Sequence, residues 1–358
     1  MKLHAWPAPP APGADELLSS YLSRVALRYG MTPTRFCAYH VGHTNVWTRD
    51  VDRSATDALC QAIATMSALP IERVQAMTMR EVAQRISPER SPVQHCRTSQ
   101  RWVNVLSIYH RIRRGYGLQY CPACLSESGY FRRVWRMSFH TVCPVHRSMF
   151  LDACPSCGSP IMLHRHQVSL LRCHQCGRHL QRFAADSAIS MTTDFSAVLA
   201  LADRFQSACD QGFTVMGDQR LSTDAFLGGA HFLMRQNGLW ERQQETGTPG
   251  PRTLEMEHCR VPERHRRLER LGAVLRDWPV AFLREARSHD ATQRSLLATG
   301  VPPKWIAAAA EALPEGIPHD RTRRPLDFRN RLRALHRLKQ PGWRGRRAEI
   351  LLLAGGAR

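Results

Sequence analysis

Apolar residues outside the middle of the chain recur at the spacing of amphipathic helices. In the first third this pattern predicts four helices, which cover residues 15–27, a short stretch from about residue 32, residues 55–69 and residues 70–86. The first helix and the short one meet at Gly30, as in a helix-turn-helix. Plain packing of two helices explains this pattern equally well, so both interpretations stay open.

The last part of the chain shows the same helical spacing. It predicts helices at residues 194–240, 264–278 and 280–287, and a second helix-turn-helix candidate at residues 291–313. In that candidate Gly300 lies at the turn and Trp305 in the second helix, where packing is at least as good an explanation as reading of a DNA groove. The pattern predicts a mainly α protein with helix-turn-helix-like N-terminal and C-terminal helical domains and a central, cysteine-rich module.

At roughly 150 residues per domain, 358 residues predict two or three domains. We expect an N-terminal helical domain, a double zinc-binding module, a helical segment, a linker and a basic C-terminal helical domain, over residues 1–100, 115–185, 186–245, 246–257 and 258–358. The start of the sequence has no apolar signal region, and no apolar stretch is long enough to span a membrane. The expected location is therefore the cytoplasm.

Charge indicates a polyanionic partner. Lysine and arginine total 50 against 30 acidic residues, which gives a formal net charge of +20. Such an excess on a cytosolic chain is typical of proteins that bind nucleic acid, directly or through an RNA-containing partner. Bases gather most densely between residues 319 and 347, where arginines can hold phosphates bidentately. The candidate phosphate contacts are Arg321, Arg323, Arg324, Arg329, Arg331, Arg333, Arg337, Lys339, Arg344, Arg346 and Arg347; a solvated helix face is the alternative.

The chain has 12 cysteines, and their spacing indicates metal rather than disulfides. Eight ligand candidates form four short knuckles of the C-x2-C or C-x2-H type, separated by distances that suit tetrahedral zinc. The first predicted site consists of Cys121, Cys124, Cys143 and His146. The second predicted site consists of Cys154, Cys157, Cys173 and Cys176. Four protein ligands leave no position for water or substrate, so the sequence predicts two structural Zn²⁺ ions.

Residues next to the knuckles support this interpretation. Proline follows the first cysteine of three knuckles and fixes a tight turn, and Gly158 and Gly177 can adopt the positive φ that aims backbone N–H groups at the thiolates. One of the neighbouring histidines is an alternative to His146 as a ligand: His140, His164, His166, His174 or His179. Cys37, with two nearby histidines, lacks a second knuckle and is predicted to be structural. We expect Cys60, Cys96, Cys209 and Cys259 to be core residues or free thiols.

Motifs for enzymatic chemistry are missing from the sequence. It has no phosphate-binding G-x-x-x-x-G-K-[ST] loop, no G-x-G-x-x-G turn and no H-x-E before a P-C-x-x-C pair, as a zinc deaminase requires. Scattered carboxylates can still converge in space, which leaves an arginine-rich nuclease as a remote alternative. The sequence favours a binding or adaptor protein that is not an enzyme.

Several segments resemble the TniQ/TnsD family of transposon target-selection proteins. They are Asp15–Leu22 (DELLSSYL), Gln119–Glu127 (QYCPACLSE), Tyr130–Arg136 (YFRRVWR), Thr141–His146 (TVCPVH) and Leu151–Ile161 (LDACPSCGSPI). The resemblance covers about residues 10–185. It implies a non-catalytic adaptor that recognises an insertion target, either as DNA or through an RNA-guided CRISPR effector, and recruits an AAA+ ATPase and a transposase.

The resemblance also implies a homodimer. Within the Tyr130–Arg136 segment we expect Trp135 to lie in the core and Arg132, Arg133 and Arg136 to face a partner or phosphates. A zinc-stabilised helix-turn-helix transcription regulator is the alternative from a different functional class.

Overall fold

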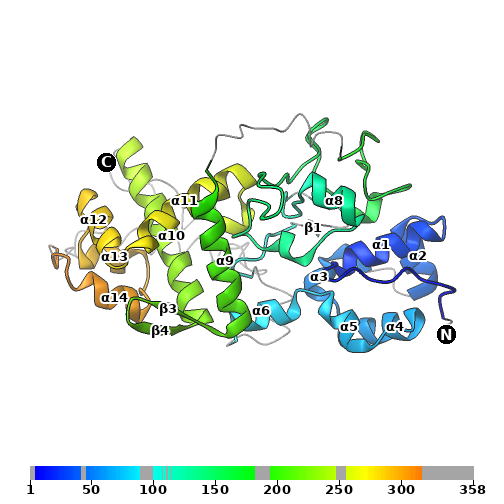
Figure 1. Cartoon of the computed structure of the whole chain (residues 1–358), viewed down its shortest axis with the longest axis horizontal. Helices are drawn as coiled ribbons and strands as arrows, with labels where there is room; N and C mark the ends of the chain where they lie inside the picture. Colours follow the sequence, from blue (N-terminus) through cyan, green and yellow to red (C-terminus); the bar gives the residue numbers. More distant parts are fainter. Residues whose placement is uncertain are drawn as a thin grey trace, which may run out of the picture.

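The structure, a computed structural model, describes residues 5–41, 46–88, 100–106, 108–109, 112–113, 115–181, 194–246 and 255–316. Over these ranges the chain is mainly helical, as the apolar spacing predicts. Figure 1 shows the N-terminal helices at one end, the cysteine-rich segment in the middle and the later helices at the other end. No helix in the described part has the length and apolar content to cross a lipid bilayer.

The N-terminal helices enclose a hydrophobic core of their own. They are α1 (Leu18–Arg28), α2 (Pro33–Phe36), α3 (Val51–Ser54), α4 (Asp57–Ser67), α5 (Ile71–Ala76) and α6 (Arg80–Ile86), with a π-helical turn at Cys37–Val41 and a 3-10 turn at Val46–Thr48. Tyr21, Leu22 and Val25 turn one face of α1 into this core. The side chain of Thr32 caps α2 and Pro33 takes its first position, which fixes where that helix starts.

The predicted helix over residues 70–86 is two helices, α5 and α6. The break lets the backbone bond to other elements, because the carbonyl of Met77 accepts from Leu18 N–H and the N–H of Met79 donates to the carbonyl of Asp52. Met77 belongs to the N-terminal core and Met79 to the larger core that fills the rest of the protein. The sequence spacing fits one continuous helix, and these tertiary contacts decide against it.

The cysteine-rich segment contains little regular structure. Its elements are the hairpin β1 (Ile108–Tyr109) with β2 (Ile112–Arg113), helix α8 (Pro122–Ser128) and the 3-10 turns η3 (Arg133–Arg136) and η4 (Leu163–Arg165). Isolated antiparallel bridges join the rest, among them Val103 with Met137 and Tyr120 with Leu151. The segment takes its order from side chains and backbone turns rather than from a sheet.

The C-terminal helices are α9 (Ser196–Gln211), α10 (Thr223–Thr246), α11 (Val261–Arg276), α12 (Val280–Ser288), α13 (Gln293–Thr299) and α14 (Lys304–Ala310), with a 3-10 turn at Met256–His258. The prediction that residues 194–240 are helical is wrong at the centre of this range, where β3 (Phe213–Met216) pairs with β4 (Gln219–Ser222). Gly217 and Asp218 form the two-residue turn of this hairpin. A Gly-Asp pair between short apolar runs is a hairpin signal in its own right.

The end of the predicted linker 246–257 is packed into the protein. The buried carboxylate of Glu257 accepts from the backbone N–H of Trp102 at 2.6 Å and lies 3.5 Å from the Nε2 atom of His231 on α10. Its backbone carbonyl accepts from Val105 N–H. This part of the predicted linker therefore joins α10 to the segment that precedes the cysteine knuckles.

Arg136 holds the N-terminal helices against the cysteine-rich segment. Its guanidinium is fully buried and contacts Asp50 at 2.6 Å, Asp52 at 3.1 Å and the carbonyl of Asn104 at 2.9 Å. Asp52 also accepts from the backbone and side chain of Ser19 on α1. Burial raises the pKa of Asp52, and the neighbouring Asp50 raises it further, whereas the contacts with Arg136 and Ser19 lower it.

The expectation for the segment Tyr130–Arg136 is thus only partly met. Trp135 is a core residue, as predicted. Arg136 does not face a partner, because it neutralises buried carboxylates, and Arg133 pairs with Asp15 at 2.9 Å. The spacing of bases in the sequence gives no sign of these distant acidic partners.

We expect the substitution Arg136→Met to lower the free energy of unfolding by about 3–5 kcal/mol, because it leaves buried carboxylates without their counter-charge. Chemical denaturation followed by tryptophan fluorescence measures the change. The control is Arg266→Met, which removes an exposed ion pair with Glu263 and should cost at most about 1 kcal/mol. Equal losses in the two variants would show that Arg136 is not a special contact.

Helix α14 packs directly on α10, so the second helix of the predicted C-terminal helix-turn-helix lies against the core. Trp305 is buried, and its Nε1 atom donates to the carbonyl of Ala225 at 3.0 Å. A Cβ atom at Gly229 would lie only 2.2 Å from the Trp305 ring, whereas one at Gly228 would meet no atom closer than 3.7 Å.

These neighbouring glycines provide a matched pair of variants. Gly229→Ala should lower the unfolding free energy by about 1–3 kcal/mol because it overfills the contact with Trp305. Gly228→Ala should raise it by about 0.5–1 kcal/mol through helix propensity. Thermal unfolding of both variants tests this; a Gly229→Ala variant as stable as Gly228→Ala would contradict the close approach of α10 and α14.

Candidate metal centres

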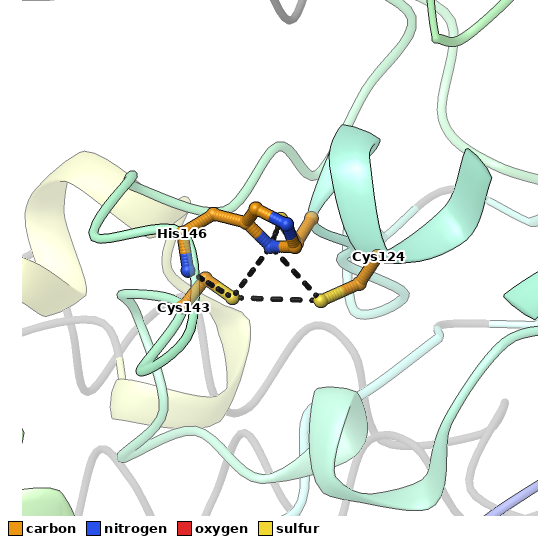
Figure 2. Close-up of side chains that lie close together, drawn as sticks. Cys124, Cys143 and His146 are labelled. Carbon is orange, nitrogen blue, oxygen red and sulfur yellow. Dashed lines mark hydrogen bonds between the residues drawn. The ribbon is translucent and has the colours of Figure 1, made fainter. Parts of the chain in front are cut away.

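The first predicted site is assembled from helix α8 and one tight turn. Cys121 lies at the N-cap of α8 and Cys124 in its first turn, while Cys143 and His146 come from the turn that follows η3. The four ligand atoms lie within 4.8 Å of one another, and the three sulfur atoms belong to buried residues. Figure 2 shows Cys124, Cys143 and His146 pointing toward one another from the two segments.

Distances in this cluster match the edges of a metal tetrahedron. The Nδ1 atom of His146 lies 3.6 Å from the Cys121 sulfur, 3.2 Å from that of Cys124 and 3.6 Å from that of Cys143. The sulfur atoms of Cys124 and Cys143 are 3.6 Å apart. In tetrahedral zinc sites, with zinc bonded to sulfur at about 2.3 Å and to nitrogen at about 2.0–2.1 Å, ligand atoms are separated by about 3.5–3.8 Å. The donor set therefore suits Zn²⁺.

Groups outside the four ligands orient this cluster. The Nε2 atom of His146 lies 3.0 Å from a carboxylate oxygen of Glu127, so Glu127 fixes the ring with Nδ1 toward the sulfurs. His146 also donates its backbone N–H to the Cys143 sulfur at 3.4 Å. A hydrogen bond from the Cys143 thiol lowers the pKa of Cys121 to about 5, against the effect of burial. The thiolate form, which metals bind, is thus favoured.

The turns that begin at Cys143, Cys154 and Cys173 share one backbone pattern. In each, the N–H of the cysteine donates to the carbonyl five residues later, and its carbonyl accepts from the N–H four residues later. The residue at that fourth position has positive φ: Gly158 at 69° and Gly177 at 70°, as predicted, but Arg147 at 48°. Glycine adopts this conformation freely, whereas arginine pays about 1–2 kcal/mol for it. The first centre therefore holds backbone strain that the second lacks.

The second predicted site is formed by two of these turns. The sulfur of Cys154 is 3.7 Å from that of Cys176, and the sulfur of Cys157 is 3.7 Å from that of Cys173; all four lie within 4.8 Å of one another. The Ser159 hydroxyl lies 3.2 Å from the Cys157 sulfur and 3.4 Å from that of Cys173. Burial alone would raise the pKa of Cys157, but its hydrogen bonds, first those from Ser159, lower it to about 6.

Tyr120 stands between the two centres. It precedes Cys121 of the first centre, and its backbone pairs with Leu151, just before the first knuckle of the second. Its side chain is fully buried. Burial raises the pKa of its hydroxyl, and the nearby thiols of Cys154 and Cys173 add to the rise. The two clusters are thus neighbours joined through one aromatic residue.

The structure brings all eight sequence-predicted ligands into two groups of four, and no other group of three or more potential metal ligands occurs among the described residues. His140 lies outside the first group, with its Nε2 atom 3.4 Å from the Gln206 side chain on α9. Cys37, Cys60, Cys209 and Cys259 are buried, as expected. Cys96 and the candidate phosphate contacts between Arg321 and Arg347 lie outside the described residues.

Sequence reasoning missed Glu127. It follows Cys124 by three residues, so helical spacing places both on one face of α8, and that spacing could have revealed it. The partners of Arg136 are different, because no local spacing connects it with Asp50 and Asp52.

Comparison with known proteins gives one family. Residues 7–149 match the model of the TniQ family, a span that includes the N-terminal helices and the whole first centre but ends before Cys154. No curated protein matches the chain.

Glu127→Gln should weaken metal binding at the first centre about 10- to 100-fold, because it removes the carboxylate that orients His146. Competition with a chromogenic chelator measures the affinity of each site. Glu81→Gln changes an exposed side chain of α6, far from both clusters in sequence, and is the control. An unchanged metal affinity in the Glu127→Gln protein would show that Glu127 does not contribute to the first centre.

Proposed function

Through residues 7–149 the chain belongs to the TniQ family, and on that premise we propose that it is a target-selection adaptor in transposition. Membership of this family supports a transposition-associated role in target selection in general. The finer proposal is that the protein recognises the insertion target and recruits the transposon AAA+ ATPase and the transposase, with no chemical step of its own.

The proposal rests on one observation: the N-terminal helices and the first centre, which together make up the matched region, are folded against each other. The N-terminal helices and the first centre are joined by buried polar contacts: Arg136 with Asp52, Ser20 with the N–H of Phe131, and Leu17 N–H with the carbonyl of Phe131. The matched residues thus form one folded platform rather than separate motifs. A rigid platform without an open metal position suits a protein that positions other proteins.

We further propose that each cluster holds one structural Zn²⁺. Thiolates and an imidazole are donors that zinc prefers, and four protein ligands close each site to water and substrate. The metal supplies cross-links for a segment that has few hydrogen-bonded elements, and its binding free energy becomes folding free energy. The eight candidate ligands would hold the two ions, and the helices on either side pack on the cross-linked segment.

Two modes of targeting fit such an adaptor. In one, the protein binds target DNA directly, with the bases between Arg321 and Arg347 as the proposed phosphate contacts. In the other, it binds a CRISPR effector whose guide RNA selects the site. For either mode we propose a homodimer in the bacterial cytoplasm, associated with the nucleoid.

The experiment is purification of the tagged protein from its native host after nuclease treatment, with identification of the proteins that co-elute. We expect the transposon ATPase to be recovered. Co-recovery of CRISPR effector subunits would assign RNA-guided targeting, and the ATPase alone would assign direct DNA targeting. An insertion assay with the ATPase and transposase, sequenced with and without this protein, should show targeted insertions only when it is present.

An insertion pattern that does not change without the protein would contradict the proposal. If the protein instead binds one palindromic operator tightly and no transposon protein co-elutes, the alternative of a zinc-stabilised transcription regulator would replace it. In the C-terminal helix-turn-helix candidate Trp305 packs against α10, so the side of α14 that carries Trp305 is not available to a DNA groove.

A further inference from the structure

The two metal centres differ in how far their sulfur ligands are open to solvent. In the first centre Cys121, Cys124 and Cys143 are at most 2% exposed. In the second centre Cys154 and Cys173 are buried, but Cys157 and Cys176 are exposed. Both exposed cysteines are the last residues of their knuckles, so each knuckle presents one sulfur inward and one outward.

Each exposed sulfur has a buried sulfur of the opposite knuckle as a close neighbour. Cys157 lies 3.7 Å from Cys173, and Cys176 lies 3.7 Å from Cys154. An oxidised, exposed cysteine would therefore find a resolving thiolate already next to it, which is the arrangement of redox-sensing cysteines. In the second centre each such pair joins the two knuckles, one sulfur from each.

We propose that Cys157 and Cys176 make the second centre a site of thiol oxidation by hydrogen peroxide, with release of its metal, while the first centre is protected. The inference rests on the proposed zinc occupancy but not on the targeting role. The exposed thiolate attacks one peroxide oxygen, the O–O bond breaks, and hydroxide leaves and takes up a proton to form water.

The cysteine is then a sulfenic acid. The buried thiolate of the opposite knuckle attacks its sulfur, the S–O bond breaks, and the leaving hydroxide forms a second water with a proton from solvent. Two thiolates have lost two electrons to one peroxide, and a Cys157–Cys173 or Cys154–Cys176 disulfide has formed. Loss of two of four ligands frees the zinc ion.

Release of this metal would act on the N-terminal helices. The loop between the two knuckles contains η4, which packs on α1 and α2. The carbonyl of Leu163 accepts from the Ser23 hydroxyl at 3.2 Å, the carbonyl of His164 accepts from the Thr34 hydroxyl at 3.3 Å, and the His164 ring stacks on Trp47. A loop freed from its metal would lose these contacts, so oxidation at residues outside the family match changes a surface inside it.

The test uses the full-length protein with its native metal. Metal content is measured first, then hydrogen peroxide is added in increments while a chromogenic zinc indicator follows release. Peptide mass spectrometry with thiol alkylation locates the oxidised residues. We expect release of one of two zinc ions, a disulfide between the two knuckles of the second centre, and faster hydrogen exchange at Leu163–Arg165, α1 and α2.

Controls separate this site from the other thiols. Cys209→Ser removes a buried cysteine and should leave release unchanged. Cys157→Ser and Cys176→Ser should each block one of the two disulfides and leave the other route. If a serine variant does not fold, mass-spectrometric mapping of the oxidised cysteines in the unsubstituted protein still tests the inference.

Simultaneous release of both ions, oxidation that begins at the first centre, or retention of both ions at peroxide levels that oxidise Cys157 and Cys176 would overturn the inference. A protein that contains no zinc before oxidation would instead contradict the proposed occupancy. Neither result bears on recovery of the ATPase, so failure of this inference and failure of the targeting role remain distinguishable.

Discussion

Full burial of the Arg136 guanidinium fixes how the N-terminal helices meet the cysteine-rich segment. A charge without access to water requires opposite charges at contact distance, and Asp50 and Asp52, beside and within α3, supply them. Asp52 then draws in α1 through Ser19. In sequence Arg136 lies between the two knuckles of the first centre, so the same ion pair anchors the segment that joins these knuckles.

The metal centres extend this arrangement across the protein. On one side η4 of the second centre's loop bonds to α1 and α2, through Ser23 and Thr34. On the other side the buried carboxylate of Asp152, two residues before Cys154, accepts from Arg260 and from the N–H of Val261 at the start of α11. The region that matches the TniQ family therefore packs on the loop of the second centre, and that centre packs in turn on the start of α11, so the adaptor we propose would behave as one body.

The two centres differ in environment although their ligand spacing is nearly the same. The first has buried sulfurs, a histidine oriented by Glu127 and a strained turn at Arg147. The second has relaxed glycine turns and two exposed sulfurs. Burial protects a thiolate from oxidants and chelators, so equal motifs need not have equal stability. A protein with one buried and one exposed centre can keep its fold when oxidants react with the exposed centre.

The sequence by itself determined the features that depend on local spacing: the eight candidate ligands, their division into two groups, the glycine turns and most helices. A knuckle consists of a few consecutive residues, so its geometry depends on residues that are adjacent in the sequence. Tertiary structure decided the rest, because those features depend on residues far apart in the chain. Contacts with α1 and α3 break the helix at Met77–Met79, and a carboxylate far away in the sequence pairs with the buried Arg136. Which cysteines of two similar motifs face solvent follows from what packs over them, and no spacing encodes that.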